Sequence, residues 1–322
     1  MLESTVIGLN SITHPHLEAW NWLVAVYLFM GGLSAGLLVM SSIANLKKWP
    51  VSGEAAHCER GAMMAPFILA VGMIFIFLDL SRKANMYWFY LTFQPSASMS
   101  WGAWGIGLII PLGILYGLST MSMPERANLK FPLLINLSAR LHPHMAKFSR
   151  LAFGMGVFLG GYTGILLSSM LARPLWNSSV LPVLFLVSAL STGTAFLIMI
   201  ARRTEVKLFY TKIDIWLIIA ELVVIVLFFY GHFTSTAIRK ASILPFFTLT
   251  SDQFMYFFSV MFVAILLPLA LVLKLTEVGQ DHADELTPAT IFRMNLSAVL
   301  VLIGGLILRL AIVYAGQLSR FL

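Results

Sequence analysis

The chain has few charged residues and almost no cysteine. Charged residues make up 11% of its 322 residues and hydrophobic residues 59%, with a mean hydropathy of +0.88. So apolar a composition excludes a water-soluble globular protein. The single cysteine, Cys58, excludes an internal disulfide and any set of thiolates that would hold an iron–sulfur cluster.

Histidine is missing from the middle of every long apolar run. A b-type haem needs axial ligands inside the helices. The seven histidines instead fall in expected loops or at expected helix ends, at positions 14, 16, 57, 142, 144, 232 and 282. We therefore expect no haem and no metal in this chain, and place any metal redox centre in another subunit.

What the chain does have is a series of apolar runs of about 18 residues or more, the length that crosses a hydrocarbon core of roughly 30 Å. These runs predict an all-α integral membrane protein that forms a single polytopic domain over residues 1–322. Eight transmembrane helices are expected, at residues 18–46, 62–80, 100–121, 149–171, 179–201, 213–231, 253–274 and 293–318.

The two halves of the chain share a short motif. Leu-Ser-Ala-Gly at 33–36 resembles Leu-Ser-Thr-Gly at 190–193, which lies 157 residues later. Four helices in each half would form units of equal orientation, so we predict two four-helix bundles, residues 1–175 and 176–322. Small residues crowd the helix contacts of any membrane protein, and this explains the match equally well.

The loops alternate in charge. The connections after the first, third, fifth and seventh spans hold fourteen Lys and Arg residues, and the opposite side holds six. Basic loops stay on the cytoplasmic side, so both termini are expected on the outer, periplasmic side of a bacterial inner membrane. The net charge of +7 is spread over short loops, so we expect no nucleic-acid partner. Residues 1–17 are polar and lack a basic start, which predicts no cleavable signal peptide.

Three ionisable residues fall inside the later spans, Asp214 and Glu221 in the sixth and Arg309 in the eighth. A charge at the middle of a membrane helix costs roughly 2.5–3.5 kcal/mol and persists mainly for function or pairing. Asp214 also fits a solvated helix start, and Glu221 and Arg309 also fit an ion pair. The functional alternative is a proton path toward the cytoplasm.

One segment combines a carboxylate, an arginine and indoles beside two apolar runs. Asp79 ends one run, Arg82 follows within a turn, and Trp101 and Trp104 open the next run. Such a combination marks one face of the bilayer. Asp79 capping its helix or pairing with Arg82 is the simpler alternative.

Two tyrosines are expected at similar depth, just below Asp79. Tyr27 lies nine residues into the first span, and Tyr162 nine residues before the outer end of the fourth. A buried phenol beside a carboxylate can donate a hydrogen bond to a carbonyl oxygen and pass on a proton, as a quinone headgroup requires. Tyrosines placed at the interface for amphipathic reasons alone are the alternative.

Four motifs follow one another along the chain. They are Tyr-Leu-Phe-Met-Gly-Gly-Leu-Ser-Ala-Gly at 27–36, Leu-Asp-Leu-Ser-Arg at 78–82, Met-Ser-Trp-Gly-Ala-Trp at 99–104, and Tyr-Thr-Gly-Ile-Leu-Leu at 162–167 followed by Arg-Pro-Leu-Trp-Asn at 173–177. In these motifs the chain resembles the NrfD-like or PsrC-like membrane subunits of polysulfide, thiosulfate and nitrite reductase complexes.

The resemblance implies a quinone-reactive membrane subunit of a respiratory oxidoreductase complex, inactive alone toward the terminal substrate. It implies bound menaquinone or ubiquinone near the outer face. It further implies electron exchange with an extracytoplasmic 4Fe-4S ferredoxin-like subunit, joined to a molybdopterin catalytic subunit or a multihaem cytochrome.

Carried over by residue, the family's tyrosine before Thr-Gly is Tyr162 and its second-helix acid is Asp79, which we predict as the catalytic residues. Some relatives use an asparagine and a histidine in the first helix, where this chain has Val24 and Tyr27. His16, just outside that helix, is an expected substitute, with an ordinary interfacial histidine as the alternative. The predicted quinone-binding set is Tyr27, Asp79, Arg82, Trp101, Tyr162 and His16.

Two outer loops, residues 83–98 and 232–252, are the longest on that side. Their aromatic side chains favour a docking surface for the partner, and an aromatic belt against lipid headgroups fits equally well. Two other classes of function stay open. One is an ion- or proton-translocating transporter, and the other is a purely structural membrane anchor.

Overall fold

The computed structural model describes residues 20–48, 50–51, 54–55, 59–121, 131–201, 203–247, 269–270, 274 and 288–318. Seven described helices are long and apolar enough to cross a membrane. The long helices are α1 (Trp22–Lys47), α2 (Glu59–Asp79), α4 (Ser98–Thr120), α7 (Met145–Ser168), α8 (Val180–Ile200), α9 (Thr204–Phe233) and α12 (Pro288–Leu318). The shorter elements are α3 (Trp88–Leu91), α6 (Pro132–Leu141), α10 (Ala237–Ile243), the two-residue strands β1 (Pro50–Val51) and β2 (Glu54–Ala55), and the 3₁₀ turns η1 (Lys83–Asn85), η2 (His142–His144) and η3 (Leu244–Phe246).

The predicted class is confirmed, because the chain is a helical, multi-pass membrane protein. Seven of the eight predicted spans correspond to these long helices. The eighth, 253–274, lies outside the described residues except for 269–270 and 274. The predicted orientation is not tested by the fold and stays a prediction.

Helix α9 begins nine residues before the predicted start of its span, at Thr204 instead of 213. The basic residues at its beginning suggested a loop. Lys207 is nonetheless buried inside the helix, where its Nζ donates to the carbonyl oxygen of Ile198 at 2.7 Å and to Asn295 Oδ1 at 2.9 Å. Hydrogen bonds of this kind compensate for burying the ammonium group, so the helix continues through the basic stretch.

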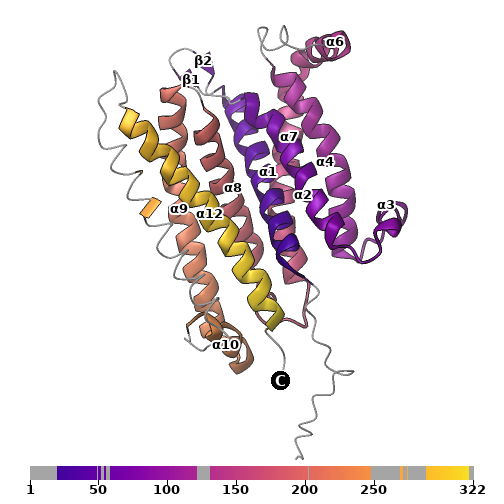
Figure 1. Ribbon diagram of the computed structural model, residues 1–322, viewed down its shortest axis with the longest axis vertical. Helices are drawn as coiled ribbons and strands as arrows, with labels where there is room; N and C mark the ends of the chain where they lie inside the picture. The colour runs from indigo at the N-terminus through magenta and orange to yellow at the C-terminus, as the bar shows by residue number, and fades with distance from the viewer. Residues whose placement is uncertain are drawn as a thin grey trace, which may run out of the picture.

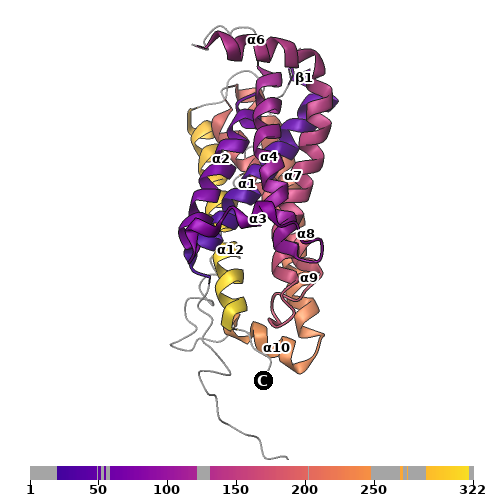
Figure 2. The same ribbon diagram turned by 90° about the vertical axis from the view of Figure 1, so that its right-hand side faces the viewer.

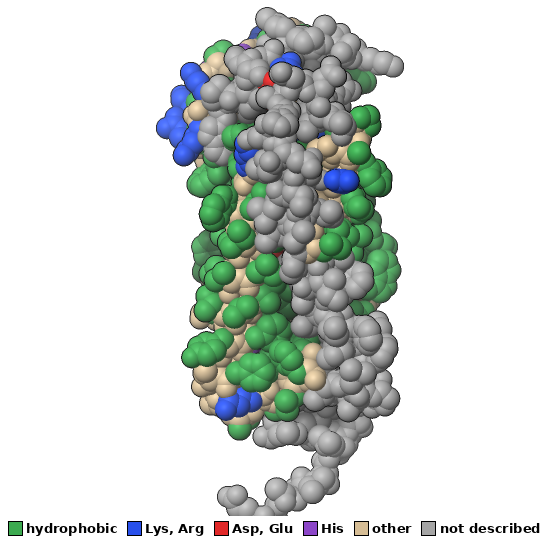
Figure 3. All heavy atoms as spheres, turned by 90° about the vertical axis from the view of Figure 1, so that its left-hand side faces the viewer, with side chains coloured by type: hydrophobic (Ala, Val, Ile, Leu, Met, Phe, Trp, Pro, Cys, Tyr) green, Lys and Arg blue, Asp and Glu red, His purple; other side chains and the backbone are tan. Residues whose placement is uncertain are grey.

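The long helices lie side by side in an elongated bundle, with α6 at one end and α10 at the other (Figures 1 and 2). We call these the α6 end and the α10 end. Helix α1 is mostly buried and packs against α2, α7, α8 and α12. On the face shown in Figure 3, hydrophobic side chains cover much of the bundle, and Lys and Arg gather mainly toward the upper end. A band of apolar side chains is what a hydrocarbon environment requires.

The backbones of α1 and α8 come together at the two glycines of the repeated motif. A Cβ atom on Gly36 would overlap the carbonyl oxygen of Ala189 and lie 3.0 Å from the Cα of Gly193. Small residues allow membrane helices to approach this closely. The contact joins the predicted units 1–175 and 176–322, whose separation into two bundles stays a prediction.

We predict that Gly36→Ala destabilises the protein, because its methyl group would overlap the α8 backbone. Overpacking of this kind costs about 1–3 kcal/mol, so the midpoint of thermal unfolding in detergent should fall. Gly161→Ala, on α7, is the matched control, since a Cβ there meets nothing within 4 Å. Equal unfolding midpoints for the two variants would contradict the α1–α8 contact.

Candidate functional site

A cavity of about 200 Å³ is lined by residues of α1, α2, α3, α4 and α7 and by the segments beside them. Helix α3 and the adjoining ends of α1, α2 and α4 lie in the half of the bundle toward α10 (Figure 2). The cavity walls are mainly apolar, with one carboxylate and three phenols among them. The lining residues are Trp20, Val24, Tyr27, Leu28, Met73, Ile76, Phe77, Asp79, Leu80, Met86, Phe89, Tyr90, Met99, Gly102, Ala103, Ile106, Tyr162 and Leu166.

Three residues predicted from the sequence meet in this cavity. Tyr27 and Tyr162 are buried, and Asp79 is half-buried. Each lies within two turns of a helix end, Tyr27 after the start of α1, Tyr162 before the end of α7, and Asp79 as the last residue of α2. Because α1 runs opposite to α2 and α7 in the bundle, all three side chains reach the same depth.

The Tyr162 ring is positioned by two glycines on α4. Its hydroxyl lies against Gly102, where even a Cβ atom would overlap it. Phe158 stacks on Tyr162, with ring centroids 5.7 Å apart and an interplanar angle of 22°, and lies against Gly105 in the same way. The glycine of the Trp-Gly-Ala-Trp motif therefore makes room for the phenol, a role that sequence reasoning missed.

Asparagine at the start of α1 links the helix cap to Asp79. Asn21 Oδ1 accepts a hydrogen bond from the backbone N–H of Leu23 at 2.8 Å, as an N-cap residue does. The side chain of Asn21 also lies close to the Asp79 carboxylate. Asp79 is thus beside the start of α1.

Trp20, which lines the cavity, is fixed by the far end of the chain. Its backbone N–H donates to Gln317 Oε1 at 3.1 Å, and Gln317 Nε2 donates to the Trp20 carbonyl oxygen at 2.6 Å.

The 173–177 motif contacts the same residues. The ring of Trp20 stacks on Trp176 with ring centroids 5.3 Å apart, and Trp176 Nε1 donates to the Ile312 carbonyl oxygen at 2.8 Å. Arg173 donates to the Gln317 carbonyl oxygen. The 173–177 motif thus holds a cavity wall in place.

Tyr90 on α3 supplies a third phenol, which was not among the predicted quinone-binding residues. Its ring packs on Gly107, where a Cβ atom would come within 3.3 Å of the ring. Partial burial raises the pKa of Tyr90 above its usual value. The phenol therefore stays protonated and able to donate a hydrogen bond near neutral pH.

Two other predicted contacts, Arg82 and Trp101, do not line this cavity. Arg82 is exposed and precedes η1. Trp101 is 48% exposed, donates from Nε1 to the Pro95 carbonyl oxygen at 2.8 Å, and packs edge-on against Phe93. His16 lies outside the described residues. Among the residues that the structure describes, no three His, Cys, Asp or Glu side chains gather to hold a metal ion.

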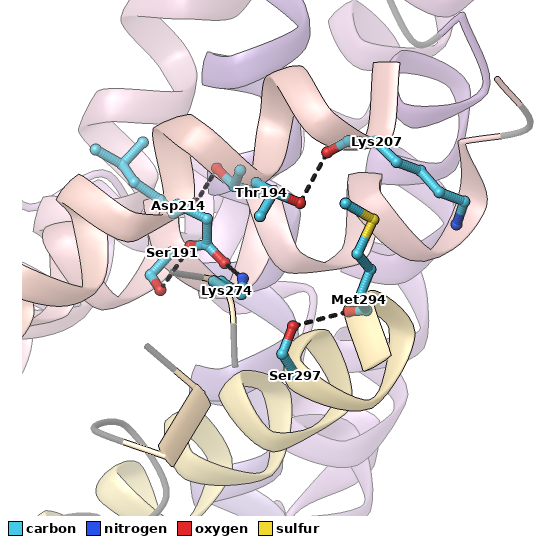
Figure 4. A network of polar contacts seen from close by, with 9 residues as sticks. Ser191, Thr194, Lys207, Asp214, Lys274, Met294 and Ser297 are labelled. Carbon is cyan, nitrogen blue, oxygen red and sulfur yellow. Dashed lines mark hydrogen bonds and ion pairs between the residues drawn. The ribbon is translucent and has the colours of Figure 1, made fainter. Parts of the chain in front are cut away.

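Asp214 is fully buried, which excludes the solvated helix start as its explanation. It forms an ion pair with Lys274, which is also fully buried, and Ser191 Oγ donates to Asp214 Oδ1 at 3.1 Å. These three side chains point toward one another in Figure 4. Two opposite charges and a hydroxyl satisfy one another here, as buried charges require.

Glu221 and Arg309 are also fully buried, but the described atoms satisfy them incompletely. Arg309 Nη1 donates to Ser188 Oγ at 3.2 Å and to the Gly305 carbonyl oxygen at 2.8 Å, while Nε and Nη2 lack a described partner. Glu221 lies beside Ser188, but neither of its carboxylate oxygens forms a hydrogen bond with a described group. Each unsatisfied group calls for an explanation, and the proton path through Glu221 and Arg309 stays a prediction.

The fold and the cavity define a class, a multi-pass helical membrane protein with an apolar cavity that presents phenols and a carboxylate. The chain belongs to the NrfD family, since the family model described as "Polysulphide reductase, NrfD" matches residues 10–320.

Three relatives illustrate the similarity. A polysulfide reductase chain of Wolinella succinogenes is 26% identical over 96% of this chain and 97% of its own length. Protein NrfD of Escherichia coli is 27% identical over 69% of this chain and 74% of its own length. A tetrathionate reductase subunit of Salmonella typhimurium is 29% identical over 71% of this chain and 64% of its own length.

We predict that Gly102→Ala displaces the Tyr162 hydroxyl and weakens any ligand that this hydroxyl binds. Its control is Gly154→Ala on α7, where a Cβ meets nothing within 4 Å. A crystal or cryo-electron microscopy structure of Gly102→Ala should show the Tyr162 ring rotated away from α4. An unmoved ring would mean that Gly102 does not position the phenol.

Proposed function

We propose that this chain is the quinone-reactive membrane subunit of a respiratory oxidoreductase complex. The observation that supports it best is the meeting of Tyr27, Asp79 and Tyr162 in one apolar cavity. An apolar cavity of about 150 Å³ holds benzene, so one of about 200 Å³ has room for a substituted six-membered ring. Menaquinone or ubiquinone is the proposed substrate.

Reduction of a quinone adds two electrons and two protons, one proton to each carbonyl oxygen, and oxidation of the quinol reverses this. In our proposal Tyr162 donates a hydrogen bond to one carbonyl oxygen and orients the ring. Asp79, half-buried at the end of α2, exchanges protons between that site and water. The electrons pass to or from a metal centre of a partner subunit.

The names of the relatives support a partner of this kind, because they describe single chains or subunits of polysulfide, tetrathionate and selenate reductases. We propose an extracytoplasmic 4Fe-4S ferredoxin-like subunit, joined to a molybdopterin catalytic subunit or a multihaem cytochrome. The cavity lies in the half of the bundle toward α10, away from the α6 end with its basic loops. The positive-inside rule therefore supports our proposal that the cavity lies on the periplasmic side of a bacterial inner membrane.

We predict that a fluorescent quinol analogue binds the purified chain saturably. Tyr162→Phe should lower the affinity for this analogue about three- to tenfold. This is the effect of losing one hydrogen bond in an apolar site. Asp79→Asn should lower the affinity for the analogue as well. Tyr230→Phe, an exposed tyrosine on α9 away from the cavity, is the matched control. Unchanged turnover of the whole complex in both cavity variants would instead favour a purely structural anchor.

A second candidate function is proton movement through the later helices. Lys207, Asp214 and Glu221 follow one another at seven-residue intervals on α9, about 10.5 Å apart at 1.5 Å per residue, on one buried face. Arg309 lies beside the last of them. We propose that Asp214, Glu221 and Arg309 form part of a proton path from the cytoplasmic side.

We predict that Glu221→Gln, in the whole complex reconstituted into vesicles, lowers the number of protons taken up from the inner side per quinone. Glutamine keeps the shape of glutamate but cannot carry a proton. Glu205→Gln, at the exposed first turn of α9, is the control. An unchanged proton stoichiometry in Glu221→Gln would rule out this path.

A further inference from the structure

The exposed side chains that line the cavity lie on one side of it. Among its lining residues, those from α1 and α7 are buried or half-buried, and just three side chains are exposed. They are Phe77 at the end of α2, Phe89 on α3 and Met99 at the start of α4, with exposed fractions of 37%, 42% and 47%. The opening therefore lies between α2 and α4, beside α3, and its rim is apolar.

An exposed apolar surface continues from this opening along α2. Phe77 and Ile74 are one turn apart on the same face, and Val71 and Phe67 follow at the same helical spacing. Ile74 is 56% exposed and Phe67 58%. A continuous stripe of large exposed apolar side chains is stable against hydrocarbon and not against water, so the opening faces the interior of the bilayer.

Helix α3 lies along α4 at this opening and does not extend beyond the end of the bundle (Figures 1 and 2). It turns Phe89 and Tyr90 toward the cavity, with Tyr90 packed on Gly107 of α4. Tyr87, Trp88 and Leu91 face outward, and Leu91 is 70% exposed. The aromatic side chains of this segment are thus divided between the cavity and an apolar exterior.

We propose that the opening bounded by Phe77, Phe89 and Met99 is the binding subsite for the polyprenyl tail of a quinone. The headgroup reaches the cavity sideways from the hydrocarbon core, and the tail remains on the α2 stripe formed by Phe77, Ile74 and Val71. This inference rests on the proposed function and adds to it the route and the place of the tail. The cavity and the α2 stripe are continuous, so one molecule with a polar headgroup and a long apolar tail can occupy both, as a quinone does.

A second apolar hollow lies on the other side of α4, where Leu108, Met155 and Phe158 are among its lining residues. It is a competing position for the tail. The rings of Tyr162 and Phe158, packed against Gly102 and Gly105, separate it from the cavity. A tail on that side could not join a headgroup in the cavity without moving both rings, which favours the opening beside α3.

The test is photolabelling of the whole chain in lipid nanodiscs with a quinone that carries a diazirine on its first prenyl unit. We expect labels on Phe77, Phe89 or Met99 that excess unlabelled quinone displaces. Displaceable labels on Leu108, Met155 or Phe158 would overturn the inference. Labels that excess lipid displaces but quinone does not would also overturn it, because the opening would then hold an acyl chain.

A pair of variants separates this inference from the proposed function. Ile74→Asn places a polar group on the α2 stripe outside the cavity, and should weaken a long-tailed quinone roughly tenfold while leaving a tailless analogue unchanged. Val226→Asn, on the exposed face of α9, is the matched control and should change neither. Equal affinity of Ile74→Asn and wild type for the long-tailed quinone would overturn the tail subsite. Failure of the tailless analogue to bind wild type would instead overturn the quinone site itself.

Discussion

The close approach of α1 to its neighbours is the contact on which the rest of the structure depends. In a bilayer the lipid tails are as apolar as the helix surfaces, so helices associate through packing. Gly36 meets the α8 backbone, and Gly156 of α7 is so close to α1 that a Cβ would lie 2.9 Å from the Ala35 carbonyl oxygen. Helix α1 is therefore held at the centre of the bundle, and Tyr27 in its second turn and Trp20 just before its start line the cavity.

The same close packing accommodates a buried cation. Gly32 leaves space on α1 that the Arg309 guanidinium fills. The rings of Phe29 and Phe185 flank it at 5.7 Å and 5.5 Å from their centroids, and aromatic faces attract cations most strongly where water is excluded. Arg309 is thus enclosed by contacts from α1 and α8, and a larger side chain in place of Gly32 would displace it.

The sequence predicted the helices and the three central cavity residues, because both depend on distances along single helices. Apolar runs predicted seven described spans, and residue counts brought Tyr27, Asp79 and Tyr162 to one level. What it could not predict depends on helix rotation and on contacts between distant segments. Trp101 and Gly102 are neighbours that point about 100° apart on α4, so the glycine faces Tyr162 and the indole faces outward. The clamp between Trp20 and Gln317 joins residues 297 positions apart, which no local pattern reveals.

Two successive residues of α1 face the two proposed sites, the quinone cavity and the proton path at Arg309. Leu28 lines the cavity, whereas the ring of Phe29 lies against Arg309. A helix packed this closely moves as a unit, since single side chains have no free space into which to shift. A headgroup that displaces α1 would therefore move Phe29 and Gly32 relative to the guanidinium, and with it the charge beside Glu221. Helix α1 borders both proposed sites, so a movement of this helix would reach both of them.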